Sequence, residues 1–189
     1  MSKKSAILSL GAFDAEGEGV NAVIETPQGS RYKYKFDEET GLFKLGGVLP
    51  LGASFPFDFG FIPATLGGDG DPLDVLILMD APAFAGCLVA ARLLGVIEAE
   101  QTEAGQTNRN DRLIAVAAES RTHCDVRELG HLNPQLLDEI EHFFRFYNEV
   151  RGKQFKPLGR FGTERALKLV KEGVKLHRKA RGAKKRRKA

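Results

Sequence analysis

The first half of the chain contains one strictly alternating segment and several apolar runs with β-branched residues, which together predict β-strands. In residues 31–36 basic and aromatic side chains alternate strictly, the pattern of a strand with one buried face. This alternation puts Lys33 and Lys35 together on the opposite face. Further strands are predicted over the apolar runs 20–25, 75–79, 88–97 and 113–118. Strands at these short, irregular intervals favour a small closed barrel over β-α-β units.

The last third of the chain shows the spacing of two amphipathic helices. Asn133 is a good N-cap and Pro134 suits the first helical position, and apolar residues recur at helical spacing as far as Val150. A second helix is predicted to begin near Thr163 and to fray near Gly182. Strands first and helices last predict an α+β fold, a small closed, OB-like β-barrel with C-terminal helices packed on it.

Charge is divided unevenly along the 189 residues. Residues 175–189 contain nine Lys or Arg and no acid, whereas the rest holds 19 basic and 25 acidic residues, a net charge of −6. We therefore expect residues 1–174 to form a single domain and residues 175–189 to be a disordered basic tail. An acidic body suits a site that collects divalent cations, so contact with nucleic acid is expected only through the tail.

Signals for a membrane or for secretion are weak. No apolar run approaches the roughly 20 residues of a membrane span, and the start of the sequence makes a poor signal peptide. Cys87 and Cys124 lie far apart and lack metal-ligand spacing, which is typical of reduced thiols. These features predict a cytoplasmic protein without a membrane partner.

Three carboxylates stand within six residues, Asp69, Asp71 and Asp74, just before the strand predicted at 75–79. Pro72 and the neighbouring glycines disfavour a helix, so Asp69 and Asp71 can project to one side of an extended loop. Hard divalent cations prefer such oxygen ligands. On composition alone, a solvated Asp-rich turn is an equally good interpretation. A calcium EF-hand is excluded because Pro72 interrupts the loop and the required Gly and terminal Glu are missing.

The surroundings of this loop carry a family resemblance. Residues 55–62 read Phe-Pro-Phe-Asp-Phe-Gly-Phe-Ile, and residues 69–75 read Asp-Gly-Asp-Pro-Leu-Asp-Val. Together they resemble the signature region of the soluble family I inorganic pyrophosphatases, and the resemblance covers residues 20–156. It implies hydrolysis of pyrophosphate to two phosphates by a metal-activated water. It also implies several Mg²⁺ ions per site, with Mn²⁺ or Zn²⁺ as substitutes, and a homo-oligomer, commonly a hexamer in bacteria.

The same resemblance implies roles for individual acids. Asp69 and Asp74 would ligate magnesium, and Asp71 would contact metal and act as general base on the attacking water. Glu25 matches the acid at the edge of the family's metal cluster. Without the match, Glu25 would be interpreted as an exposed residue at a strand end.

Phosphate-binding positions partly match the family and partly depart from it. Lys33 matches a phosphate-binding lysine. Tyr147 matches a tyrosine that hydrogen-bonds phosphate, although its spacing also fits a core aromatic residue. Lys35 stands where the family usually has an acid and would supply a second cation for phosphate. Gly47 falls where a phosphate-binding arginine is expected, and Lys44 is the nearest substitute, with a point charge instead of a bidentate fork.

Residues 103–112 should supply further metal ligands. The family pattern there is an acid, a second acid and then a lysine, but this segment is longer by two or three residues. Glu103 is the candidate for the first acid, and Arg112 fits the lysine. The second acid falls on Asn110 or, with a slip of one residue, on Asp111. We prefer Asp111, because several magnesium ions need a negative charge that Asn cannot provide. An ordinary charged hairpin is the alternative.

Three further departures support a rival interpretation. Phe55 and Phe59 replace tyrosines and Asn148 replaces a phosphate-binding lysine, so the chain could be a relative that binds metal–phosphate compounds such as polyphosphate or a nucleotide without hydrolysing them well. A second rival is a barrel-fold nucleic-acid-binding module, favoured by the alternation in residues 31–36 and the basic tail. The acidic loop argues against it. The four histidines show no ligand spacing.

Overall fold

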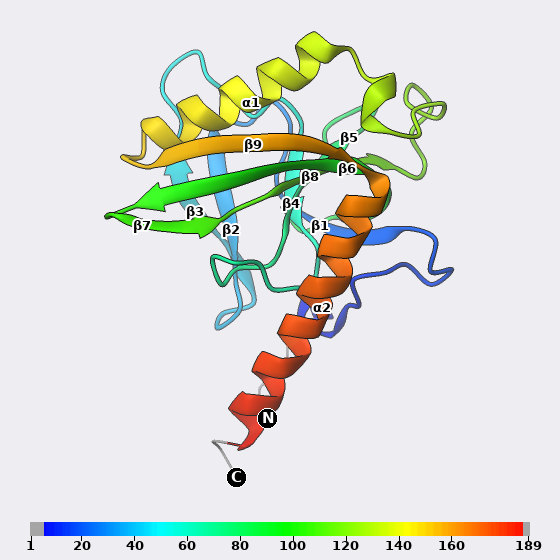
Figure 1. Cartoon of the computed structure of the whole chain (residues 1–189), viewed down its shortest axis with the longest axis vertical. Coiled ribbons are helices and arrows are strands. Elements are labelled where there is room, and N and C mark those ends of the chain that lie inside the picture. Colours follow the sequence, from blue (N-terminus) through cyan, green and yellow to red (C-terminus); the bar gives the residue numbers. More distant parts are fainter. Residues whose placement is uncertain (1–5, 187–189) are drawn as a thin grey trace.

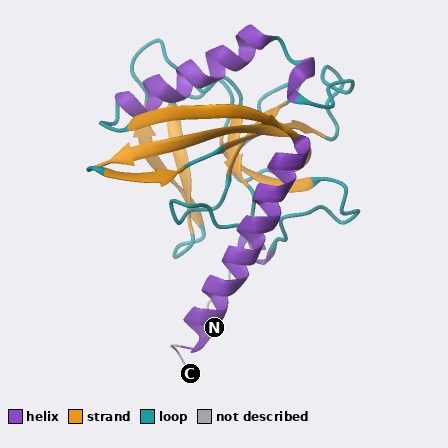
Figure 2. Cartoon of the chain, in the orientation of Figure 1, coloured by secondary structure: helices purple, strands orange, loops and turns teal. Residues whose placement is uncertain are grey.

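The computed structural model describes residues 6–186 (Figure 1). Strands are the main regular structure of the first two thirds, and two long helices lie in the last third (Figure 2). In chain order the elements are η1 (Ala6–Ser9), β1 (Val20–Thr26), β2 (Tyr32–Asp37), β3 (Leu42–Val48), β4 (Asp58–Phe61), β5 (Asp74–Leu78), β6 (Leu88–Glu103), β7 (Gln106–Arg109), β8 (Arg112–Ala117), η2 (Leu129–His131), α1 (Pro134–Glu149), β9 (Gln154–Gly162) and α2 (Thr163–Arg186).

Five strands close into a ring. β1 pairs with β4, β4 with β5, β5 with β8, β8 with β6, and β6 again with β1. All these pairs are antiparallel except β5–β8, in which Asp74 lies opposite Arg112 at the first position. The long strand β6 also pairs with β7 and β9, and β2 and β3 form a separate two-stranded sheet. The predicted α+β fold with an OB-like closed ring of strands is confirmed.

Alternate side chains of the ring strands divide into two apolar clusters, as the period of two requires. On β5, Val75 and Ile77 belong to a cluster shared with β1, β6, β8 and α2. Leu76 and Leu78 belong to a second cluster, which packs against α1. The helix contributes to it the buried side chains Leu137, Ile140 and Phe144. A buried side chain of this size stabilises the fold by about 1.5–3 kcal/mol, so packing holds both helices on the ring.

The predicted strands and helices are found with boundaries shifted by a few residues. α1 begins at Pro134, and Asn133 Oδ1 caps it by accepting a hydrogen bond from Gln135 N at 2.9 Å. α2 begins at Thr163. Sequence patterns missed β3, β4, β7 and β9. Because β9 lies between the two helices, the expected order of strands first and helices last is wrong in this detail.

α2 continues without a break to Arg186. Residues 175–186 of the predicted tail are helical in the structure, and residues 187–189 lie outside the described part. The division into a domain ending at residue 174 and a tail stays a prediction. Ala166 and Val170 are buried in the core and anchor the start of this helix. Lys, Arg and Ala are good helix formers that extend an anchored helix at little cost. Within residues 6–186, no helix is both long enough and apolar enough to cross a membrane.

A β-bulge in β1 sets the position of Glu25. Ile24 lies opposite Gly60 of β4 and Thr26 lies opposite Phe59, which leaves Glu25 as the extra residue between them. A bulge bends its strand and re-aims the side chain of the extra residue. This geometry requires β1 and β4 to approach closely at Gly60.

Replacing Gly60 with alanine is expected to destabilise the fold. A Cβ at Gly60 would lie 2.1 Å from the carbonyl oxygen of Val23, and rotation of a side chain cannot relieve a clash with backbone. We expect Gly60→Ala to lower the free energy of unfolding by at least about 2 kcal/mol, measured by urea denaturation. Gly162→Ala is the control, since a Cβ there has no heavy atom within 4 Å. Equal stability of the two variants would contradict the close approach.

Candidate functional site

A cavity of about 1000 Å³ lies beside the ring. Its walls come from the β4–β5 loop, the β2–β3 sheet, the end of β6, the C-terminal part of α1 and the second half of α2. All residues predicted for the site line it except Asp111 and Lys44. Its polar lining includes Glu25, Lys33, Lys35, Asp69, Asp71, Asp74, Glu103, Asn110, Arg112, Tyr147, Asn148, Arg151 and Lys153.

The acidic loop between β4 and β5 is fixed by its own backbone. Gly70 has a φ of +89°, a left-handed conformation that glycine adopts at least cost. Gly67 N donates to Asp71 O at 2.7 Å, and Asp71 N donates to Asp69 Oδ1 at 3.1 Å. Asp69, Asp71 and Asp74 all reach the same cavity, so the loop is more than a turn whose acids project separately into water.

Two lysines of β2 hold two of the carboxylates, and both lysines face the cavity as the alternation predicts. Lys33 Nζ lies 2.7 Å from Glu25 Oε2, with both side chains largely buried. The other oxygen of Glu25 accepts from Phe36 N at 2.8 Å, so Glu25 is not an exposed strand-end residue. Lys35 Nζ lies 2.7 Å from Asp71 Oδ2, and both side chains are more than half exposed. Such an exposed pair is weak and can open toward a ligand.

The buried guanidinium of Arg112 holds Asp74. Arg112 Nη1 lies 2.6 Å from Asp74 Oδ2 across the first position of the β5–β8 pair. The Arg112 guanidinium carbon also lies 4.9 Å from the ring centroid of Phe144 and 5.3 Å from that of Phe155. Pairing and stacking together replace part of the hydration that this buried cation has lost, while its Nε is buried without a hydrogen-bond partner among the described residues.

Burial changes the proton affinity of the acids in the cavity. It raises the pKa of Asp74 to about 6, although the charges of Arg112 and Lys33 lower it. Burial also raises the pKa of Asp69, and the nearby charge of Asp71 adds to this effect. Concentrating carboxylates here therefore has a free-energy cost, which a divalent cation among them would offset.

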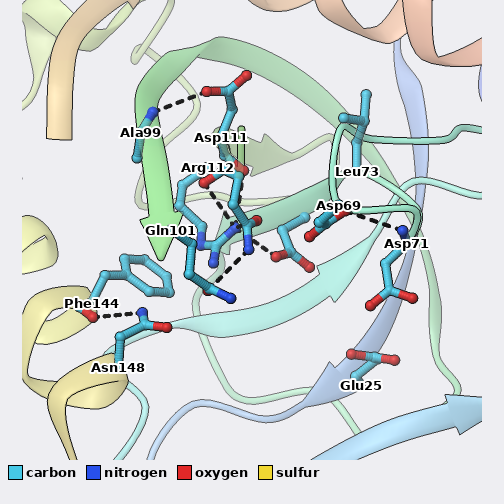
Figure 3. Close-up of polar contacts among 12 residues, drawn as sticks. Glu25, Asp69, Asp71, Leu73, Ala99, Gln101, Asp111, Arg112, Phe144 and Asn148 are labelled. Atoms are coloured by element: carbon cyan, nitrogen blue, oxygen red, sulfur yellow. Dashed lines mark hydrogen bonds and ion pairs between the residues drawn. The ribbon is translucent and has the colours of Figure 1, made fainter. Parts of the chain in front are cut away.

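Asp111 does not face the cavity, and its predicted place as the second acid is wrong. Figure 3 shows its side chain pointing away from the acidic loop. Asp111 Oδ1 accepts from Ala99 N at 2.9 Å and from Arg109 Nη2 at 2.7 Å. Asn110 lines the cavity instead. Successive side chains of an extended segment point to opposite sides, so Asn110 shares the side of Arg112 and Asp111 cannot.

Lys44 lies outside the cavity as well, so its predicted role as the substitute cation is wrong. Its ammonium group pairs with Asp37 at the end of the neighbouring strand. Glu103 does line the cavity, and its Oε2 lies 2.7 Å from Lys153 Nζ. Sequence reasoning gave Lys153 no role.

Aromatic rings support the cations of the cavity. The rings of Tyr147 and Phe55 pack edge to face with centroids 5.5 Å apart, and burial raises the pKa of Tyr147. Lys33 Nζ lies 4.3 Å from the centroid of Phe59. Phe55 and Phe59 thus keep the packing expected of aromatic residues at these positions. Arg151 donates to the hydroxyl of Tyr147 at 3.1 Å.

The C-terminal end of α1 departs most from the sequence-based expectations. Asn148 is buried, and its Nδ2 donates to the carbonyl of Phe144 at 2.8 Å (Figure 3), so part of its amide serves its own helix. Arg151 and Lys153 lie beyond the end of this helix and line the cavity. Their only sequence signal is that two basic residues follow closely after Tyr147.

The carboxylates of the cavity fit hard divalent cations that take most of their ligands from water and phosphate. Among the described residues, no three acidic, His or Cys side chains form a ready-made metal cluster. Magnesium binds through one or two carboxylates and keeps several waters, so a closed protein cage is not required. The exposed pair Lys35–Asp71 can release its carboxylate, and the raised pKa of Asp74 marks a site that a cation would stabilise.

Comparisons of the sequence with known proteins identify relatives of this chain. The family model "Inorganic pyrophosphatase" matches residues 22–178. An inorganic pyrophosphatase of Synechocystis sp. is 39% identical over 156 residues, 82% of this chain and 90% of the relative. One of Halalkalibacterium halodurans is 40% identical over 157 residues, 83% of this chain and 94% of the relative.

A solved structure agrees with these relatives. The crystal structure of inorganic pyrophosphatase from Thermus thermophilus superposes with a TM-score of 0.83 at 34% identity, covering 91% of this chain and 98% of that one. The range matched by the family model contains α1 and β2 to β9 in full, together with most of β1 and of α2. The chain therefore belongs to the inorganic pyrophosphatase family.

Proposed function

We propose that this chain hydrolyses inorganic pyrophosphate to two phosphates, using water activated by bound divalent cations. The observation that carries the proposal is that acids and cations line the same cavity. The acids are Asp69, Asp71 and Asp74, and the cations include Lys33 and Arg112. Pyrophosphate is a compact polyanion, and a site for it needs cations at its oxygens and a carboxylate next to the attacking water. The family membership of the chain supports the same reaction.

Magnesium is the proposed metal, with manganese or zinc as substitutes. Asp69, Asp74, Glu25 and Glu103 are proposed to hold the ions, and Asp71 contacts them from the exposed side. When bound, the metal lowers the pKa of a coordinated water and neutralises charge on the leaving phosphate. Asp111, which pairs with Arg109 outside the cavity, has no part in this proposal.

Asp71 is proposed as the general base. In the cavity its Oδ2 pairs with the ammonium group of Lys35 at 2.7 Å. When a phosphate group enters, Lys35 turns from Asp71 to the phosphate oxygens. Asp71 then accepts the proton of the attacking water at its free oxygen.

Substrate phosphate is proposed to bind Lys33, Lys35, Arg112 and the hydroxyl of Tyr147. Lys33 and Arg112 are buried, stacked on aromatic rings and already oriented by carboxylates, so little side-chain order is lost on binding. The rival idea of a non-catalytic binding relative is not favoured, because relatives about 40% identical to this chain are inorganic pyrophosphatases and the proposed base Asp71 lines the cavity. A nucleic-acid-binding module is disfavoured by the acids of the cavity.

A homo-oligomer, with a hexamer as the expected form, remains a proposal that rests on the family resemblance. A cytoplasmic location remains a proposal that rests on the weak secretion signal and the cysteine pattern. Three large apolar side chains, Phe84, Leu158 and Phe161, are more than 40% exposed and are candidates for subunit contacts. Analytical ultracentrifugation of the full chain checks the assembly, and a monomer at micromolar concentration would contradict it.

Replacing Asp71 with asparagine is expected to lower kcat for pyrophosphate by about 10²- to 10⁴-fold, because asparagine cannot accept the proton of the attacking water. Phosphate release is followed in millimolar Mg²⁺, and EDTA is expected to abolish it for the wild type. The control is Asp125→Asn, which removes one exposed carboxylate outside the cavity and should change kcat by less than about twofold. Wild-type rates in Asp71→Asn, with unfolding unchanged, would exclude the base role.

Removing residues 183–189 is expected to leave kcat and KM within about twofold of the full chain. The described lining of the cavity ends at Arg181, and the anchoring residues of α2 lie far earlier. Circular dichroism of the shortened chain verifies that α2 still folds. A larger loss of activity would make the terminal segment part of the enzyme.

A further inference from the structure

Gly47 and Arg151 compete for the same space. Gly47 lies on β3, and its φ falls outside the left-handed region that favours glycine, so the backbone accepts any residue there. A Cβ built on Gly47 would lie only 3.0 Å from Nη1 of Arg151. The guanidinium group of Arg151 therefore borders the space into which a side chain at position 47 would extend.

Tyr147 anchors Arg151 in this position. The guanidinium carbon lies 5.3 Å from the centroid of the Tyr147 ring, and Nη1 donates to the Tyr147 hydroxyl at 3.1 Å. Arg151 lines the cavity of the acidic loop and also a smaller adjoining hollow of about 370 Å³, which Gly47 and Lys153 line as well. The guanidinium group thus reaches from the end of α1 across to β3.

The cations of the cavity differ in how far carboxylates already neutralise them. Lys33, Lys35, Arg112 and Lys153 each pair with an acid within 2.7 Å. In the described part of the chain, Arg151 forms no such ion pair. Among residues 6–186, Arg181 forms none either, but it belongs to α2 and makes no hydrogen bond or ion pair with the acidic loop or with Tyr147. An arginine with an unpaired fork at the wall of an anion site is well suited to bind a phosphate group through two parallel hydrogen bonds.

We propose that Arg151 binds a terminal phosphate group of pyrophosphate, and that the glycine at position 47 provides the room for its guanidinium. This role rests on the proposed function of the cavity. The cation on the β3 side of the site is then Arg151, which lies in the turn after α1. Lys44 of β3 forms an ion pair with Asp37 instead.

Binding of methylene diphosphonate, which cannot be hydrolysed, tests the role separately from turnover. Calorimetry in millimolar Mg²⁺ is expected to show about tenfold weaker binding for Arg151→Ala than for the wild type, because a charge-assisted bidentate contact is lost. Arg151→Lys should fall between them. In hydrolysis, KM for pyrophosphate should rise by a similar factor while kcat changes less than about threefold, as for a group that contacts ground state and transition state alike.

A second variant tests the exchange of positions. Gly47→Arg combined with Arg151→Ala should recover affinity to within about threefold of the wild type, since the vacated space accepts the new guanidinium. The matched control is Arg145→Ala on α1, the helix that precedes Arg151, where Arg145 pairs with Glu141 outside the cavity. Its affinity should equal that of the wild type.

Two results would overturn the inference while leaving the enzyme assignment intact. One is an Arg151→Ala protein that binds the diphosphonate as tightly as Arg145→Ala does. The other is a double variant no tighter than Arg151→Ala alone. A wild type that neither binds the diphosphonate nor hydrolyses pyrophosphate would instead remove the proposed function, and this inference with it.

Discussion

The arrangement of this protein depends on neutralising acids in a confined space. Carboxylates that would repel one another are gathered at one side of a ring of strands. Glu25, Asp71 and Asp74 each pair with a cationic side chain that lies on another element. Opposite charge at hydrogen-bond distance is what makes partial burial of these acids tolerable. The elements are therefore connected through the site as well as through the apolar core.

These ion pairs differ in solvent exposure, and the difference fits the role proposed for each pair. The pairs of Lys33 with Glu25 and of Arg112 with Asp74 are largely buried and stacked on rings, so they form a rigid frame. The pair of Lys35 with Asp71 lies in water and is weak. A site that binds a polyanion and also transfers a proton benefits from two rigid, buried ion pairs together with one exposed ion pair that can open.

Much of the architecture could be predicted from sequence because its signals are local. The alternation before Phe36, the cap at Asn133 and the cluster beginning at Asp69 each depend on neighbours within a few residues. β3 and β9 were missed because they lack a clean period of two: β3 is mostly exposed and contains two glycines, and β9 contains Pro157.

Asp111 was assigned to the site from its charge, whereas the direction of its side chain determines whether it reaches the cavity. Asp111 has the charge that a metal ligand needs, but it follows Asn110 and precedes Arg112 on an extended segment, so it points to the other side. The alternation of side chains alone could have excluded it. Arg151 could not be predicted in this way, because its nearness to Gly47 arises from the packing of α1 beside the β2–β3 sheet and leaves no trace in local sequence.

The parallel pairing of β5 with β8 affects when the site can form during folding. Asp74 and Arg112 are separated by a long stretch of chain, yet they meet at the first position of that pair. Contacts between such distant residues close late, after the intervening strands and turns have ordered. A growing or fragmentary chain that ends before Arg112 would carry the acidic loop without the cation that balances it, so competence for binding should arise only when the ring closes.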